Sequence, residues 1–173
     1  LATFFNRASA LDICYHWSQQ ADKILLQVFD RFCDKDNLSL WALGKLGAME
    51  LNLSSDVDLL FICKEATPEA FKQVRLFQNF LSQTKSAPLV PTLDQVLDYY
   101  GNYGETWERI AFVRCRFLVG SQEIQSSLEP FIKRFTYRKH LDYALFDDLR
   151  SLREKIHQTV KTEGGRIHLK LVP

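Results

Sequence analysis

The chain has 173 residues, and 22 Lys and Arg against 21 Asp and Glu leave a net charge of +1. It is 46% hydrophobic and 13% aromatic, which excludes a disordered protein and suits one compact domain, or one domain and part of another. The balanced charge argues against a general coating role on nucleic acid, which needs a basic excess. The low counts of 7 Gly and 5 Pro favour helices over a many-stranded β-sandwich.

The cysteine spacing and the hydropathy indicate the cellular compartment. No two cysteines have CxxC spacing, so we expect neither a zinc ribbon nor a disulfide framework, but reduced, mostly buried thiols in a cytoplasmic protein. They are Cys14, Cys33, Cys63 and Cys115. No apolar run approaches the roughly 18 residues of a membrane span, so we expect no membrane association. Because the chain opens at Leu1 and stops at Pro173 just after an apolar run, we expect a piece of a longer protein.

Apolar periodicity predicts the elements in chain order. In the first half it predicts a helix over 4–32, a buried strand over 38–43, a glycine-bracketed turn at 44–47, a polar connector over 50–55, a strand over 57–63 and a helix over 71–81. Two prolines predict an extended segment at 88–91. The second half reads as helices over 93–100, 107–119, 128–137 and 141–160, and the pattern at 167–172 admits a strand.

Two carboxylates open the second predicted strand, where residues 40–61 read LWALGKLGAMELNLSSDVDLLF. Side chains alternate along a strand, so Asp56 and Asp58 would project from one face and Val57 from the other. Adjacent carboxylates repel each other, and a hard cation such as Mg²⁺ would neutralise both. Mg²⁺ held by two carboxylates is the usual partner of nucleotide phosphates, and two such ions can clamp attacking and leaving oxygens.

A glycine-bracketed turn precedes this pair. Without a Cβ, Gly44 and Gly47 would let backbone N–H groups approach a phosphate, and Lys45 would add a charge. The turn is not a Walker A loop, because Leu46 follows the lysine where Ser or Thr is required. A lone D-x-D is more often a solvated strand edge, and a lone G-x-x-G is more often a plain turn. Together, on strands that otherwise read as core, they favour a functional site.

The order of strand, G-x-x-G turn and D-x-D strand resembles the polymerase-β-like nucleotidyltransferases, an α+β fold with a small mixed sheet. The string GKLGAMELNLSSDVDLLF is similar to that of the glutamine synthetase adenylyltransferase family, also called adenylyl-removing enzymes. The family pattern is approximately GKLGG-x-ELN-[FY]-SSD-[IL]-DLIF, and Ala48 replaces its second glycine. Later segments agree, namely APLV at 87–90 with YY at 99–100, WER at 107–109 with RCR at 114–116, and FIKRFTYRKHLD at 131–142.

The resemblance implies half of a bifunctional enzyme. In that family the C-terminal half adds AMP from ATP to a tyrosine of glutamine synthetase, and the N-terminal half removes it by phosphorolysis that releases ADP. Asn52 and the stretch at 135–143 resemble the N-terminal, adenylyl-removing half more closely. Glutamine synthetase and the PII signalling protein are the implied partners. We expect a nucleotidyltransferase domain over 1–120 and the start of a helical domain over 121–173.

The resemblance also assigns roles to residues. Asp56 and Asp58 would be catalytic and would hold Mg²⁺, with two ions expected, and ATP, ADP or AMP would be substrate or product. The residues expected to bind the nucleotide or its phosphates are Gly44, Lys45, Gly47, Ser54, Ser55, Arg109 and Arg116.

Two pairs of these residues keep alternative roles. Ser54 and Ser55 either touch phosphate or only cap the turn before the strand. Arg109 and Arg116 would share one face of the predicted helix over 107–119, where they either reach the nucleotide or the modified tyrosine, or pair with neighbouring acids.

One family feature is missing. Family members carry a third carboxylate in a D-x-R-L-R-P strand ahead of the APLV segment, whereas here Thr84 runs directly into Lys85. Either a segment is lacking at this junction or the site has lost a ligand. The second hypothesis is therefore a catalytically inactive nucleotide- or partner-binding regulatory module of the same fold. A uridylyltransferase of the same pathway is disfavoured by the GKLG and ELN strings.

Overall fold

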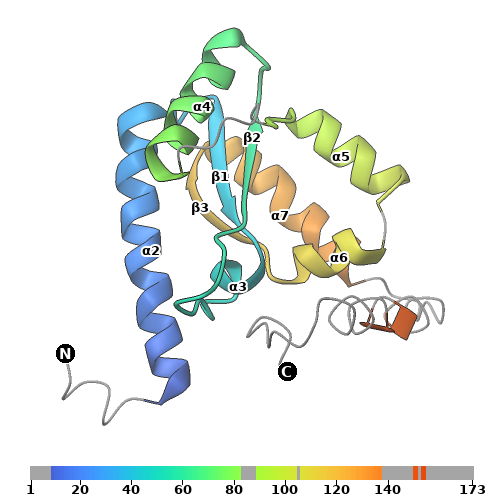
Figure 1. Ribbon diagram of the computed structural model, residues 1–173. Coiled ribbons are helices and arrows are strands. Elements are labelled where there is room, and N and C mark those ends of the chain that lie inside the picture. The colour runs from blue at the N-terminus through green and yellow to red at the C-terminus, as the bar shows by residue number, and fades with distance from the viewer. Residues whose placement is uncertain (1–8, 83–88, 105, 138–149, 152, 155–173) are drawn as a thin grey trace.

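The computed structural model describes residues 9–82, 89–104, 106–137, 150–151 and 153–154. They form an α+β fold in which helices cover both faces of a small sheet (Figure 1). The elements in chain order are α2 Ala10–Phe32, β1 Leu38–Ala42, α3 Gly44–Gly47, β2 Leu59–Cys63, α4 Pro68–Ser82, α5 Leu93–Asn102, α6 Thr106–Val113, β3 Arg116–Gly120 and α7 Gln122–Thr136.

The sheet has three strands in the order β2-β1-β3, and both pairings are antiparallel. The predicted mixed sheet is therefore corrected: among the described residues, parallel pairing is limited to an isolated bridge between Cys63 and Thr92. All five residues of the central strand β1 are buried. Its register places Leu40 opposite Phe61 and Trp41 opposite Leu60.

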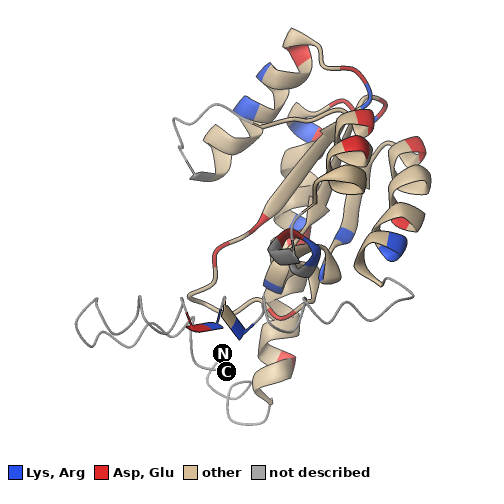
Figure 2. Ribbon diagram, turned by 90° about the vertical axis from the view of Figure 1, so that its right-hand side faces the viewer, with Lys and Arg blue, Asp and Glu red and all other residues tan. Residues whose placement is uncertain are grey.

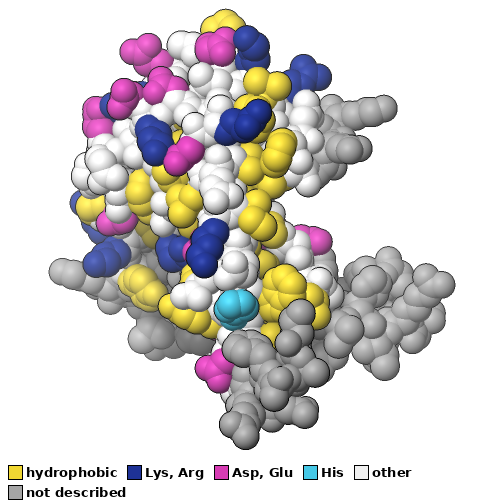
Figure 3. Space-filling model, turned by 90° about the vertical axis from the view of Figure 1, so that its left-hand side faces the viewer, with side chains coloured by type: hydrophobic (Ala, Val, Ile, Leu, Met, Phe, Trp, Pro, Cys, Tyr) yellow, Lys and Arg dark blue, Asp and Glu magenta, His cyan; other side chains and the backbone are white. Residues whose placement is uncertain are grey.

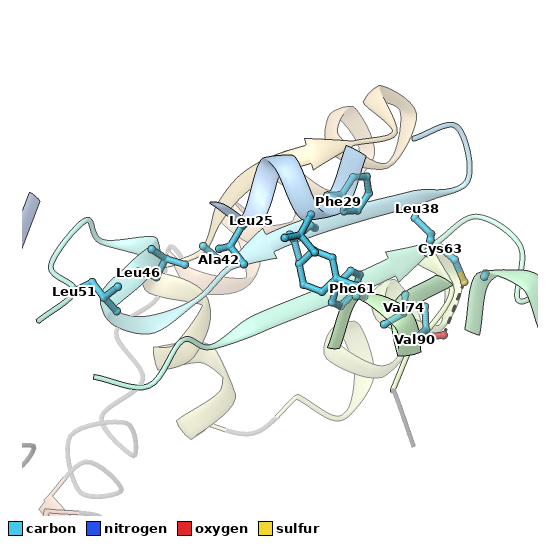
Figure 4. Close-up of a cluster of buried hydrophobic side chains, with 14 residues drawn as sticks. Leu25, Phe29, Leu38, Ala42, Leu46, Leu51, Phe61, Cys63, Val74 and Val90 are labelled. Carbon is cyan, nitrogen blue, oxygen red and sulfur yellow. Dashed lines mark hydrogen bonds between the residues drawn. The ribbon is translucent and has the colours of Figure 1, made fainter. Parts of the chain in front are cut away.

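Strand alternation divides the core into two clusters. On one face, Leu40 and Phe61 pack with Phe29 of α2 and Phe77 of α4 (Figure 4). The Phe61 and Phe77 rings pack edge to face, with their centroids 5.0 Å apart. This geometry adds about 0.5–1.5 kcal/mol of stability beyond that from burial. On the other face, Trp41 packs with residues of α5 and α7. The sheet is thus held between α2 and α4 on one side and α5 and α7 on the other.

Helix α2 confirms the first predicted helix from Ala10 onward, and residues 4–8 lie outside the described part. Its start is fixed by a capping box, in which the Ser9 hydroxyl accepts from the Asp12 N–H and the Asp12 carboxylate accepts from the Ser9 N–H. Such a cap satisfies two backbone donors that the first helical turn leaves open. Helix α2 ends at Phe32, the residue at which the predicted helix ends.

The predicted helix over 107–119 is wrong in its second half. Helix α6 ends at Val113, and Arg116–Gly120 forms β3 against β1. Without β3, one edge of the central strand would leave buried backbone groups without hydrogen bonds. The free-energy cost of those groups outweighs the helical preference of the local sequence. Gly120 marks the strand end, since it has φ 119° and a Cβ there would lie 2.2 Å from the Leu38 carbonyl oxygen.

The helix predicted over 128–137 begins earlier, because α7 starts at Gln122, and the turn predicted at 44–47 is the short helix α3. The other predicted elements lie within a few residues of the observed ones where the structure describes them. The strand predicted over 167–172, most of the helix predicted over 141–160 and the junction of Thr84 with Lys85 fall outside the described residues. Helix α7 contacts α5 and α6, and a domain boundary at residue 120 stays a prediction.

The charge distribution agrees with the composition, whereas the expectation of mostly buried thiols is wrong, because three of the four cysteines are only partly buried. Acidic and basic residues are interspersed along the helices (Figure 2). All four cysteines are free, and Cys63 is the buried one. Burial raises the pKa of the Cys33 and Cys115 thiols to about 12. No helix in the described ranges is both long and apolar enough to span a bilayer.

Candidate nucleotide and metal site

The two aspartates lie just ahead of β2, which begins at Leu59, and not within it as predicted. The reason is that β1 leaves the sheet after Ala42, so regular pairing stops at the Ala42–Leu59 pair. One further bond, from the Leu43 N–H to the Asp58 carbonyl at 3.0 Å, ties the connection to the end of β1. That the Asp56 and Asp58 carboxylates share one face stays a prediction.

Gly44 leaves room for the Asp58 side chain. Its φ of 55° lies in the left-handed region, which non-glycine residues rarely adopt. A Cβ on Gly44 would lie 2.9 Å from Asp58 Oδ2. The glycine turn and the D-x-D string are therefore brought together: the exposed Asp58 carboxylate rests against the backbone at the start of α3.

Gly47, at the other end of the turn, has a packing role. A Cβ there would lie 1.7 Å from the Arg114 carbonyl oxygen and 2.8 Å from that of Ala42. Both atoms belong to the backbone and cannot move aside cheaply. Gly47 thus lets α3 lie directly on the segment that leads into β3.

Arg116 holds the same short helix. It lies in β3, so the prediction that it shares a helix face with Arg109 is wrong. Its guanidinium donates to the Leu46 carbonyl at 3.1 Å, to the Gly47 carbonyl at 3.3 Å and to Asp22 Oδ1 at 3.0 Å. The last carbonyls of a helix lack intrahelical partners, and Arg116 satisfies two of them while tying α3 to α2.

Arg109 lies on α6 and is 7% exposed. Its guanidinium stacks over the Phe135 ring of α7, 5.8 Å from the ring centre. Arg114 instead forms an exposed salt bridge of 2.8 Å with Glu50. The arginines of this region are thus distributed over three separate contacts, and their expected nucleotide contacts stay predictions.

The loop between α3 and the aspartates is organised by Asn52. Its side-chain oxygen accepts from the Ser54 N–H at 3.1 Å, from the Ser54 hydroxyl at 3.1 Å and from the Ser55 hydroxyl at 2.7 Å. Such a turn fixes the chain just before the D-x-D string. The structure therefore gives both serines the turn-capping role, and phosphate contact by either stays a prediction.

Ser18 is a positioning residue that the sequence analysis missed. It is fully buried on α2, where its hydroxyl donates to the Cys14 carbonyl at 2.8 Å and accepts from the Leu51 N–H at 3.0 Å. This bond fixes the start of the Asn52 loop. The available signal was a hydroxyl within the apolar stripe of α2, where a buried polar group needs partners.

The carboxylate ligands at this site suit a cation that is bound together with a nucleotide. Among the described residues, no three His, Cys, Asp or Glu side chains are grouped to hold a metal. Mg²⁺ is commonly bound by one or two carboxylates together with substrate phosphates and water. Asp56 and Asp58 fit that role, whereas a metal held by protein groups alone would need more ligands.

The sequence matches a known protein family. The family model described as glutamate-ammonia ligase adenylyltransferase matches residues 8–84 and 82–130. The chain belongs to this family. The two matched segments overlap at 82–84, beside the junction of Thr84 and Lys85 where the family's D-x-R-L-R-P strand is lacking.

Curated relatives in the family carry the name bifunctional glutamine synthetase adenylyltransferase/adenylyl-removing enzyme. One from Nitrosococcus oceani is 29% identical over 196 residues, covering 95% of this chain and 20% of its own length. One from Idiomarina loihiensis is 27% identical over 214 residues, covering 98% and 23%. The chain thus spans about a fifth of each of these relatives.

A solved toxin–antitoxin structure with AMP-PNP also resembles the chain. Its TM-score is 0.37 at 15% identity, and the likeness covers 81% of this chain and 98% of the other. A likeness this weak carries no argument about the site.

Proposed function

We propose that the chain is a Mg²⁺-dependent nucleotidyltransferase module that acts on glutamine synthetase. The observation that supports it best is the Asp58 carboxylate lying against the Gly44 backbone, two residues after Asp56 in the chain. Family membership supports the substrate, because the relatives are named for glutamine synthetase. We place the chain in the cytoplasm and assign it to the adenylyl-removing half, under control of PII.

In this proposal phosphate attacks the adenylyl phosphorus on the modified tyrosine. The bond between phosphorus and the tyrosine oxygen breaks, ADP leaves, and the tyrosine oxygen takes up a proton. Bound Mg²⁺, one ion or two, supplies charge neutralisation at the transferred phosphoryl group. Asp56 and Asp58 hold the metal, while Lys45 and the backbone N–H groups near Gly44 orient the phosphates.

The remaining assigned residues support this arrangement. Ser54 and Ser55 shape the approach to Asp56, and Gly47 seats α3 on the sheet. Arg116 holds the end of α3, and Arg109 is proposed to reach the nucleotide or the modified tyrosine.

A second candidate is a module that binds nucleotide or a partner without turnover. It is favoured by the donor set, in which the described residues supply two carboxylates to the site and no grouped third. It is also favoured by the break in the family match at 82–84.

Incubation with adenylylated glutamine synthetase, phosphate and Mg²⁺ separates the two candidates. The enzyme reading predicts ADP release that Asp58→Asn abolishes and that Asp94→Asn, an exposed acid on α5, leaves unchanged. ADP binding without ADP release would support the second candidate. Absence of both would exclude the enzyme and the nucleotide-binding form of the second candidate.

A further inference from the structure

Helix α2 holds both ends of the segment from Leu46 to Leu51, which leads from α3 to the D-x-D string. Ser18 and Asp22 are one helical turn apart and therefore lie on the same face of α2. The Ser18 hydroxyl accepts from the Leu51 N–H at 3.0 Å. Asp22 Oδ1 accepts at 3.0 Å from the Arg116 guanidinium, which donates to the Leu46 carbonyl at 3.1 Å. Two neighbouring positions of one helix thus fix the start and the end of this segment.

These contacts lie on the inner side of α2, away from water. Ser18 is fully buried and Leu51 is 7% exposed, while the Asp22 and Arg116 side chains are 17% and 32% exposed. The outer face of α2 lies in solvent, and Figure 3, which views this side, shows basic, acidic and apolar side chains interspersed there. Breaking a buried hydrogen bond is costly, because the group left behind stays unsatisfied. The inner contacts should therefore hold the segment firmly.

The segment contains a strained residue. Met49 has φ 61°, in the left-handed region that non-glycine residues rarely adopt. Its N–H donates to the Leu46 carbonyl at 3.1 Å, and the Glu50 N–H donates to the Lys45 carbonyl at 2.7 Å. This pattern ends many helices and usually has glycine where Met49 stands. Such strain persists where the surrounding structure fixes the residue, and it is concentrated at functional sites. Here the two contacts with α2 fix it.

We propose that Ser18 and Asp22 together are positioning residues for the nucleotide site, because they clamp the strained Met49 turn to α2 and so fix the loop that leads to Asp56. Without either contact, Met49 would relax toward an ordinary backbone conformation. The end of the segment would then shift, and with it Asn52, whose side chain organises the turn just before Asp56. The clamp rests on the geometry alone, whereas its role in nucleotide binding rests on the proposed function.

Amide hydrogen exchange without nucleotide tests the clamp. The informative amides are those of Met49 and Ser55, which donate to the Leu46 and Asn52 carbonyls and not to either clamp residue. Both should exchange at least tenfold faster in Ser18→Ala and in Asp22→Asn, which keeps the side-chain shape and removes the charge. If Ser18→Ala fails to fold, Asp22→Asn alone decides.

Two matched variants serve as controls, and both should leave the two amides unchanged. Ser126→Ala removes an exposed hydroxyl of α7 that donates to the Gln122 carbonyl at 2.8 Å, as Ser18 does to Cys14 within α2. Asp30→Asn removes an exposed ion pair of α2 with Lys35. Met49→Gly accepts the left-handed conformation without strain, so adding it to Asp22→Asn should restore slow exchange of the Ser55 amide.

Calorimetric titration with ADP and Mg²⁺, on variants that urea unfolding shows to be folded, tests the positioning role. Asp22→Asn should weaken ADP binding at least tenfold, and Asp30→Asn should leave it unchanged. Unchanged exchange in the clamp variants, or no restoration by Met49→Gly, would overturn the clamp. Faster exchange with unchanged ADP affinity would overturn the positioning role. If the unsubstituted chain binds no ADP, the proposed function and the positioning role fail together, while the exchange result still decides the clamp.

Discussion

A Cβ on Gly44 would lie 2.9 Å from the carboxylate oxygen Oδ2 of Asp58. The preceding residue, Leu43, donates its N–H to the Asp58 carbonyl at 3.0 Å, so the main chain and the side chain of Asp58 both lie against this turn. The G-x-x-G and D-x-D strings are therefore one structural unit, in which the glycine leaves room for the acid.

Gly44→Ala should lower both stability and nucleotide binding. Its φ of 55° costs a non-glycine residue about 1–2 kcal/mol, which urea unfolding would measure. The Asp58 carboxylate is the free end of a side chain, so it should rotate away from the new methyl group at little further cost. We expect Mg²⁺-dependent ADP binding to weaken at least tenfold.

The stability loss from Gly44→Ala should be nearly the same in an Asp58→Ala background. A much smaller loss there would mean that the carboxylate is held rigidly against the glycine. Unchanged ADP affinity in Gly44→Ala would contradict the role given to this pair.

Gly47→Ala should be far more damaging than the matched change at Gly101. The new Cβ would meet the Arg114 carbonyl oxygen at 1.7 Å, and we expect a loss of about 3 kcal/mol or more, or failure to fold. At Gly101, within α5, the nearest atom to a Cβ is a Phe131 ring carbon at 3.9 Å. Alanine there should stabilise by about 0.4–1 kcal/mol. Similar unfolding midpoints for the two variants would contradict this account of Gly47.

The two glycines of the turn differ in how much of their role the sequence could predict. Spacing alone predicted that Gly44 and Asp58 belong to one site, because a glycine turn and a D-x-D string ahead of a core strand are rarely combined by chance. It could not separate the roles of the two glycines. The need for glycine at position 47 comes from Arg114, which is distant in sequence and near only after β3 pairs with β1.

Arg116→Ala should cost more stability than Arg114→Ala. Arg116 donates to two backbone carbonyls and to Asp22, and losing these bonds should cost about 1.5–3 kcal/mol. Arg114 pairs with Glu50 in solvent, and such pairs are worth about 0–1 kcal/mol. Arg116→Lys should recover little, since one ammonium cannot span three acceptors. Equal unfolding free energies for the two alanine variants would contradict the anchoring role.

The position of Arg116 in β3 corresponds to the largest error among the predicted elements. Residues 107–119 carry apolar side chains at helical spacing, and nothing local separates Val113 from Arg116. The strand forms there because β1 needs a second partner, which is a property of the assembled sheet. The role of Ser18 was hidden for the same reason, because its partner Leu51 lies on a different element.

Asp56 and Asp58 should bind a nucleotide together with Mg²⁺. Calorimetric titration of the chain with ADP, with and without Mg²⁺, measures it. We predict binding that requires Mg²⁺, is weakened at least tenfold by Asp58→Asn and is unchanged by Asp94→Asn. Binding of equal strength without Mg²⁺, or unaltered by Asp58→Asn, would contradict the assignment of these two carboxylates.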